Sequence, residues 1–257
     1  MGAQVRGASV KKFLKIATIS VLSILLVAGV GIWAWSRNLH ASAATEALAA
    51  LTSDADVAVA QGDDLEFRPI RKRPTMGVIL YPGASCDIRG YAPVLRRLAA
   101  AGYLVIVAAM PIEFALFGPN RALDITSSHP AVRRWVLIGH SMGGAMAGAF
   151  VAHHPDSMAG LILWDAYPAS SLADYRHPVW LLHRARPDGS PPARFVAKRA
   201  TFPSDSRWVP IPGGIHMYFG SFDGGGYKEE WAAQITRDSQ HDQEVAATLA
   251  ALKAMGG

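Results

Sequence analysis

The chain has 257 residues, of which 51% are hydrophobic and 18% are charged, and it contains 24 glycines and 16 prolines. This composition excludes a disordered chain, and the length suits one sizeable domain with a short additional segment. The formal net charge of +5 is spread along the chain, and its densest clusters, Arg71-Lys72-Arg73 and Arg133-Arg134, carry no interleaved aromatic residues, so no nucleic-acid partner is expected.

The N-terminal region has the composition of a membrane anchor. Residues 1–15 carry Arg6, Lys11, Lys12 and Lys15 without an acidic residue, and residues 16–35 then run without any charge. About 20 apolar residues cross a bilayer core as a helix, and basic residues favour the cytoplasmic side. We therefore expect a cytoplasmic segment at 1–15, a single transmembrane helix at 16–36 and an extracytoplasmic remainder. Trp33 and Trp35 would lie at the membrane–water interface.

A cleaved secretory signal is the alternative for this region. Ala41-Ser42-Ala43 offers small residues in the pattern that signal peptidases prefer, and cleavage near Ala43 would release a secreted protein. We favour the uncleaved anchor because the apolar run is longer than the roughly 7–15 residues that form the hydrophobic region of a signal peptide. Residues 37–56 are then expected to form a stalk, with a short helix over residues 40–51.

The pattern of apolar segments and helices over residues 57–257 predicts one α/β domain. An antiparallel hairpin is expected from the alternating segments 57–60 and 65–69. Buried strands are expected at 77–81, 103–109, 132–138, 161–164, 179–183 and 208–211, and helices at 91–101, 145–153 and 228–255, the last with a break near 238–242. Strands that are apolar on both faces and alternate with helices indicate a mostly parallel central sheet covered on both faces.

The stretch Trp135-Val136-Leu137-Ile138-Gly139-His140-Ser141-Met142-Gly143-Gly144 has the pattern of a nucleophile elbow. An apolar strand runs into a glycine-flanked serine, and a helix rich in small residues follows. The motif G-x-S-x-G places the serine hydroxyl on a strained turn above the sheet. Ser141 is therefore the candidate nucleophile.

A serine nucleophile needs a base, which is expected to follow it in the chain. His183 lies within a predicted strand, and His241 lies in the polar middle of the last helix. His216 follows the last strand in the glycine-rich loop Pro212-Gly213-Gly214-Ile215-His216, from which an imidazole can reach the elbow. We therefore predict that His216 is the base.

Two aspartates could orient this histidine. Asp188 stands in the turn after the strand 179–183, and Asp165 follows the strand 161–164. We favour Asp188, because the turn after the penultimate strand is the more usual place for the acid. Asp165 would otherwise cap the turn that follows it.

The oxyanion hole is expected to combine two backbone amides. One belongs to Met142, and the other comes from the loop Tyr81-Pro82-Gly83-Ala84-Ser85. We assign Ala84, with Gly83 as the neighbouring possibility. The single cysteine, Cys86, has no elbow of its own and is expected to be a small buried residue.

These motifs, together with Ala109-Met110-Pro111, Asp188-Gly189 and Gly213-Gly214-Ile215-His216, resemble the α/β-hydrolase superfamily. Within it the chain is similar to compact, lidless bacterial serine hydrolases related to dienelactone hydrolases. Ser141 stands where dienelactone hydrolase has a cysteine, which favours general ester chemistry. The resemblance implies an esterase that needs no metal or organic cofactor.

Substrate expectations are limited to a neutral ester of modest size. The aromatic segment 111–118, with Tyr167, Met217, Tyr218 and Phe219, is a candidate for the walls of an open apolar pocket. The alternatives are a thioesterase or peptidase with the same triad, and a catalytically silent binding or scaffold module. Retention of Ser, Asp and His in the expected order argues against a silent module.

Overall fold

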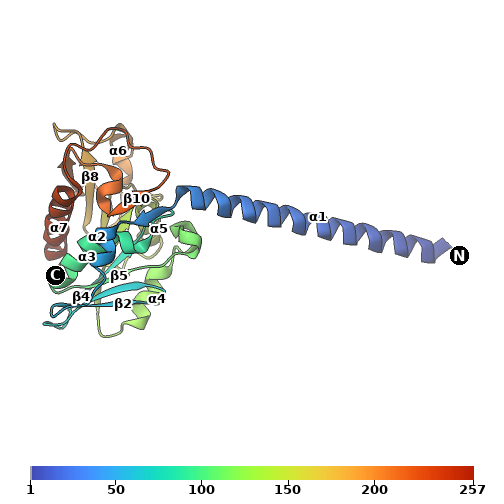
Figure 1. Ribbon diagram of the computed structural model, residues 1–257, viewed down its shortest axis with the longest axis horizontal. Coiled ribbons are helices and arrows are strands. Elements are labelled where there is room, and N and C mark those ends of the chain that lie inside the picture. Colours follow the sequence, from blue (N-terminus) through green and yellow to red (C-terminus); the bar gives the residue numbers. More distant parts are fainter. Residues whose placement is uncertain (1) are drawn as a thin grey trace. The chain divides into compact units, whose positions relative to one another are not determined.

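The computed structural model describes residues 2–257, with the side chains of residues 13–34 and 37–257. The chain divides into two compact units, an N-terminal helix that ends at Leu39 and a domain from His40 to Gly257. Each unit is described by itself. In Figure 1 the domain is the part in which strands are flanked by helices.

Helix α1 (Gly2–Leu39) contains both the basic start of the chain and its apolar run. Phe13–Leu39 is long and apolar enough to cross a membrane, a property that a signal sequence shares. Part of the predicted orientation and interface placement depends on Arg6, Lys11, Lys12 and Trp35, whose side chains lie outside the described residues.

The domain is built on an eight-stranded sheet with the order β2-β3-β5-β4-β6-β7-β8-β9. Its strands are β2 (Val57–Gln61), β3 (Leu65–Pro69), β4 (Met76–Tyr81), β5 (Leu104–Val107), β6 (Arg134–His140), β7 (Gly160–Trp164), β8 (Val179–Ala185) and β9 (Arg207–Pro212). Strand β3 runs antiparallel to both of its neighbours, and all other pairs from β5 to β9 are parallel. The predicted fold class, a parallel sheet with an antiparallel hairpin at one edge, is confirmed.

Alternation along the strands divides the core into two layers. In β4, Val78 and Leu80 face the layer that α3 (Ala92–Ala100) and α7 (Arg237–Ala254) cover. Ile79 and Tyr81 face the opposite layer, which α4 (Arg121–Ser128), α5 (Met142–His153) and α6 (Ala193–Ala197) cover. The sheet is thus buried on both faces, which explains why its strands are continuously apolar.

The segment expected to be a stalk is part of the domain. Strand β1 (Ala41–Ala43) pairs with β10 (Phe222–Gly224), and α2 (Thr45–Ala49) follows it. Ala41, Ala44 and Ala47 are buried. The prediction of a free stalk is therefore wrong, because these small side chains allow the chain to pack closely against the domain.

The C-terminal helix begins later than predicted and is not broken. It starts at Arg237. The preceding residue, Thr236, caps the helix, because its hydroxyl accepts a hydrogen bond from the Ser239 amide. Residues 228–236 form a loop instead, and side chains in this loop bind groups around His216.

Candidate active site

Ser141 occupies a strained turn between β6 and α5. Its backbone has φ 54° and ψ −123°, a conformation that costs energy for any residue other than glycine. The turn is tight: a Cβ atom on Gly143 would lie 2.1 Å from the carbonyl oxygen of Tyr81. The local geometry is that of a nucleophile elbow.

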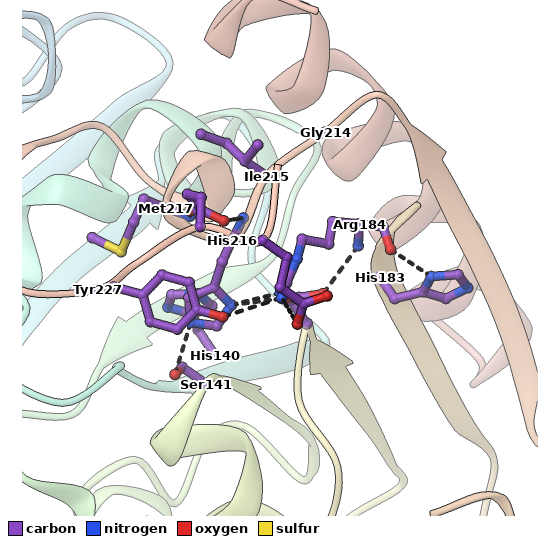
Figure 2. A network of polar contacts seen from close by, with 12 residues as sticks. His140, Ser141, His183, Arg184, Gly214, Ile215, His216, Met217 and Tyr227 are labelled. Carbon is purple, nitrogen blue, oxygen red and sulfur yellow. Dashed lines mark hydrogen bonds and ion pairs between the residues drawn. The ribbon is translucent and has the colours of Figure 1, made fainter. Parts of the chain in front are cut away.

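Ser141, His216 and Asp165 form a hydrogen-bonded relay. The hydroxyl of Ser141 lies 2.9 Å from Nε2 of His216, and Nδ1 of His216 lies 2.5 Å from Oδ2 of Asp165. Figure 2 shows His216 between Ser141 and the side of the site where Arg184 lies. The arrangement has the geometry of nucleophile, base and orienting acid.

The structure corrects the prediction of the acid. Asp188 is exposed, and hydrogen bonds from the side chain and the backbone amide of Ser190 lower the pKa of its carboxyl group. Asp165 follows β7 with a positive φ of 47°. Its amide remains bonded to the carbonyl of Leu182 in the next strand, and its carboxylate reaches His216. The prediction that Asp188 orients His216 is therefore wrong. Asp165, the other candidate, contacts His216 in its place.

Arg184 is the buried counterion of Asp165. Its guanidinium is fully buried and pairs with Oδ2 of Asp165 through Nη1, and its backbone amide donates to Oδ1 at 3.0 Å. Burial by itself raises the pKa of Asp165. The hydrogen bond from His216 and the charge of Arg184 outweigh burial and lower that pKa to about 2. Asp165 is thus held ionised.

Tyr227 covers the outer face of His216. The two rings stack with their centroids 4.0 Å apart, as Figure 2 shows. The Tyr227 hydroxyl accepts hydrogen bonds from Arg184 at 3.1 Å and from Arg194 at 2.8 Å. The imidazole is therefore held by a ring contact as well as by its two hydrogen bonds.

The loop at residues 228–236 binds the backbone of the histidine segment. The carboxylate of Glu229 accepts hydrogen bonds from the amides of His216 and Met217, and Glu230 pairs with Arg184 at 3.0 Å. Trp231 donates to the carbonyl of Gly214. These contacts explain why this segment is a loop, since a helix would draw the side chains away from the site.

Sequence reasoning did not assign roles to Arg184, Arg194, Tyr227, Glu229 or Glu230. One signal was present in the case of Arg184. It directly follows the predicted apolar strand 179–183 and lies within β8 in the structure, and a charged residue at such a position is buried only when it is paired. The others come from segments without periodicity, so no pattern identified them.

The amide of Ala84 is the free donor of the loop after β4. The Gly83 amide donates to the Tyr91 hydroxyl at 2.8 Å, and the Ser85 amide donates to the carbonyl of Glu113 at 3.0 Å. Within the described chain, neither Ala84 nor Met142 donates its amide to another group. This pattern leaves the amides of Ala84 and Met142 available to an acceptor and no free hydrogen at Gly83.

His140 supports the site from below without facing the pocket. It is fully buried, its ring lies 4.6 Å from that of His216, and its Nδ1 is 2.8 Å from the Tyr91 hydroxyl. Tyr91 accepts from Gly83, which leaves its own proton for His140. Burial and the proximity of His216 hold the pKa of His140 well below its usual value, so its ring is neutral.

The remaining candidates lie away from the relay. His183 is buried in β8 with Nδ1 near the carbonyl of Arg184, and His241 is buried in α7. Cys86 is buried, and burial raises the pKa of its thiol to about 12. The interpretation of His183 as a packed strand residue agrees with its position. The sequence places His241 in the polar middle of the last predicted helix, where a solvated side chain would be expected, and the structure buries it instead.

A cavity of about 280 Å³ opens onto the relay. It is lined by Ser141, Met142, Ala145, Asp165, Ala166, Tyr167, Arg194, His216 and Tyr227. Of the predicted apolar walls only Tyr167 is among these residues, and Phe219 is core. In the described part of the chain, no group of three or more His, Cys, Asp or Glu side chains is placed to bind a metal ion.

Comparisons with known proteins identify a family and a fold. Residues 77–242 match the model of the alpha/beta hydrolase family. A comparison with curated proteins gave no match.

Three solved structures illustrate the likeness. A predicted CIB-like hydrolase from Thermoplasma acidophilum is 17% identical with a TM-score of 0.54, and the match covers 77% of this chain and 99% of that one. A thermophilic esterase from Thermogutta terrifontis is 14% identical with a TM-score of 0.51, over 80% and 97% of the two chains. A Klebsiella pneumoniae protein proposed to be a dienelactone hydrolase is 18% identical with a TM-score of 0.48, over 73% and 90%. The first two likenesses show a shared fold.

Proposed function

This chain belongs to the alpha/beta hydrolase family, and on that premise we propose that it is a membrane-anchored serine hydrolase that cleaves carboxylic esters. The observation that carries the proposal is the relay from Ser141 through His216 to Asp165, with separations of 2.9 and 2.5 Å. Family membership supports a hydrolytic function, and the relay supports the serine mechanism.

In the first half of the reaction, the Ser141 oxygen attacks the ester carbonyl while His216 takes the serine proton at Nε2. The ionised Asp165 stabilises the imidazolium through Nδ1. The carbonyl oxygen becomes an oxyanion, which the amides of Met142 and Ala84 stabilise by about 3 kcal/mol each. His216 then returns its proton to the leaving alcohol, and the acyl group stays on Ser141.

In the second half, water replaces the alcohol. His216 takes a proton from the water as its oxygen attacks the acyl-enzyme carbonyl, and the same proton returns to Ser141 when the acid leaves. Arg184 and Tyr227 act as positioning residues in both halves, because one holds Asp165 and the other stacks on His216.

The pocket favours a neutral substrate of modest size. Arg194 is a cationic group in its lining, but it donates to Tyr227 and lies 3.4 Å from the Glu230 carboxylate. Its charge is therefore largely compensated. A cavity of about 280 Å³ accommodates a small acyl group, whereas a longer chain would extend through its open mouth.

The packing of β1 favours an uncleaved anchor, and the basic residues that precede the apolar run favour a cytoplasmic N-terminus with the domain outside. Cleavage near Ala43 would remove a strand that pairs with β10 and contains the buried Ala41. A signal peptide is normally dispensable for the fold of the mature protein, whereas this strand is paired with β10 inside the domain.

Hydrolysis of p-nitrophenyl esters of increasing acyl length by the full chain in detergent tests the proposal. Ser141→Ala should reduce kcat by about 10⁴-fold or more without changing the unfolding temperature by more than a few degrees. Equal activity of the two proteins would contradict the serine mechanism, and no activity in the wild type would favour a silent module.

A further inference from the structure

The segment from Pro111 to Phe117 exposes apolar side chains beside the active site. Ile112, Leu116 and Phe117 are 57%, 54% and 55% exposed, and we call them the apolar ridge. The ridge lies on two consecutive 3-10 turns, Pro111–Glu113 and Ala115–Phe117. Elsewhere in His40–Gly257, the exposed large hydrophobic side chains are Leu48, Ile70, Leu123 and Val196.

The backbone of the ridge is held in a costly conformation. Ile112 has φ 47° and ψ 29°, and Glu113 has φ 65°. The left-handed region is strongly disfavoured for a β-branched residue such as isoleucine. Hydrogen bonds from the Glu113 amide to the Met110 carbonyl and from the Phe114 amide to the Pro111 carbonyl hold this turn, and the turn keeps the apolar side chain of Ile112 in water instead of burying it.

The ridge is bonded to the point at which the chain enters the domain. The helix that is able to cross a membrane ends at Leu39, and the next residue, His40, contacts the Glu113 carboxylate at 2.9 Å through Nδ1. Ala41 donates its amide to Ser85 and accepts from Asp87. The first two residues after the span are therefore bonded to the ridge and to the loop after β4 within the domain.

The same contacts reach the proposed oxyanion loop. The carbonyl of Glu113 accepts from the Ser85 amide, which adjoins Ala84. The turn Ala115–Phe117 also packs against α5, the helix that begins directly after Ser141. The ridge, the residue that follows the span and one side of the active site thus form one bonded unit.

We propose that the apolar ridge docks on the lipid surface of the membrane that the N-terminal helix crosses, so that the pocket receives esters held in that membrane. Three half-exposed apolar side chains gain free energy on leaving water, and the covalent connection keeps them at the membrane surface, which lowers the entropic cost of docking. The docking is independent of catalysis. The substrate class rests on the proposed esterase function.

Fluorescence at an introduced cysteine tests the docking. Cys86 is 5% exposed and its thiol pKa is about 12, so a single new cysteine labels selectively, and the unsubstituted chain gives the background. Leu116→Cys carries an environment-sensitive fluorophore in the full chain, reconstituted into phosphatidylcholine vesicles. Ile70→Cys is the matched control. It is also 54% exposed. It follows β3, which runs antiparallel to β5, so it lies near the amino-terminal ends of the parallel strands, whereas the active site lies at their carboxyl ends.

We expect doxyl-labelled lipid to quench the probe at Leu116 and aqueous iodide to quench the probe at Ile70. A third probe at Leu25, inside the apolar run, should report insertion of the helix. If the Leu116 probe is quenched by iodide as strongly as the Ile70 probe, the docking proposal is wrong. If the Leu25 probe is also exposed to iodide, the span is absent and the proposal fails with it.

Activity on two forms of ester tests the substrate class. The double variant Leu116→Ser/Phe117→Ser should lower the ratio of vesicle-embedded to soluble ester hydrolysis by about tenfold, and Ile70→Ser should leave that ratio unchanged. An unchanged ratio in the double variant would overturn the substrate class. If the wild type cleaves neither ester, the esterase function fails, and the fluorescence result still decides the docking.

Discussion

The substitution Asp165→Asn separates two roles of one carboxylate. Asparagine has nearly the same shape, but it removes the negative charge that faces His216 Nδ1 at 2.5 Å and the buried Arg184 guanidinium. In other serine triads the equivalent change lowers kcat about 10⁴-fold, because the imidazole loses its orientation and its counter-charge. The same loss is expected here, which corresponds to about 5 kcal/mol in the activation barrier.

The effect of Asp165→Asn on stability follows from the burial of the ion pair between Asp165 and Arg184. Removal of one partner of a buried ion pair typically costs about 3–5 kcal/mol. Arg184 keeps a second carboxylate, that of Glu230 at 3.0 Å, and a hydrogen bond to Tyr227, so the lower end of this range applies. Urea unfolding of Asp165→Asn should therefore show a loss of about 3 kcal/mol.

Two further variants complete the experiment. Asp165→Asn/Arg184→Met should recover most of the stability, because no unpaired charge remains buried, and it should not recover the rate. Asp188→Asn is the control. It should change the free energy of unfolding by less than about 0.5 kcal/mol and leave kcat near the wild-type value. A large loss of kcat in Asp188→Asn, with little loss in Asp165→Asn, would refute the assignment of the acid.

Other substitutions test the packing around the site and a buried acid. Gly143→Ala should destabilise the fold by at least about 2 kcal/mol in thermal unfolding, because its Cβ would overlap the Tyr81 carbonyl. Gly62→Ala, whose Cβ would have its nearest neighbour at 3.7 Å, should change little, and equal effects would contradict the elbow geometry. Burial raises the pKa of Glu244 well above its usual value, so the folded state retains a proton that the unfolded state loses as the pH rises above about 4.5. Glu244→Gln should therefore be more stable than the wild type at high pH and similar at low pH in urea unfolding, and a pH-independent difference would contradict this reasoning.

The sequence was sufficient where a local pattern also fixes a position in space. Ser141 and His216 follow apolar strands and stand among glycines, and the parallel sheet brings the ends of these strands to one edge. No local sequence pattern distinguishes Asp165 from Asp188, because both follow strands that end at this side of the sheet. It depends on the positive φ of Asp165 and on the Arg184 amide and guanidinium, which only the folded chain brings together.

Short and non-periodic segments account for the other differences. Strand β1 has three residues, too few to show an alternation, and its role follows from pairing with β10. The loop at residues 228–236 has residues compatible with a helix, but Glu229 and Trp231 bind the backbone near His216 instead. Tertiary contacts override helix propensity there.

The central claim is that Ser141 is an activated nucleophile. A fluorophosphonate tests it directly, because the serine oxygen displaces fluoride at phosphorus and the adduct does not depend on the identity of the natural substrate. The full chain should be labelled on the peptide that contains Ser141, labelling should disappear in Ser141→Ala, and it should slow strongly in His216→Ala. Absence of labelling in the folded wild type, or labelling that persists in Ser141→Ala, would contradict the account.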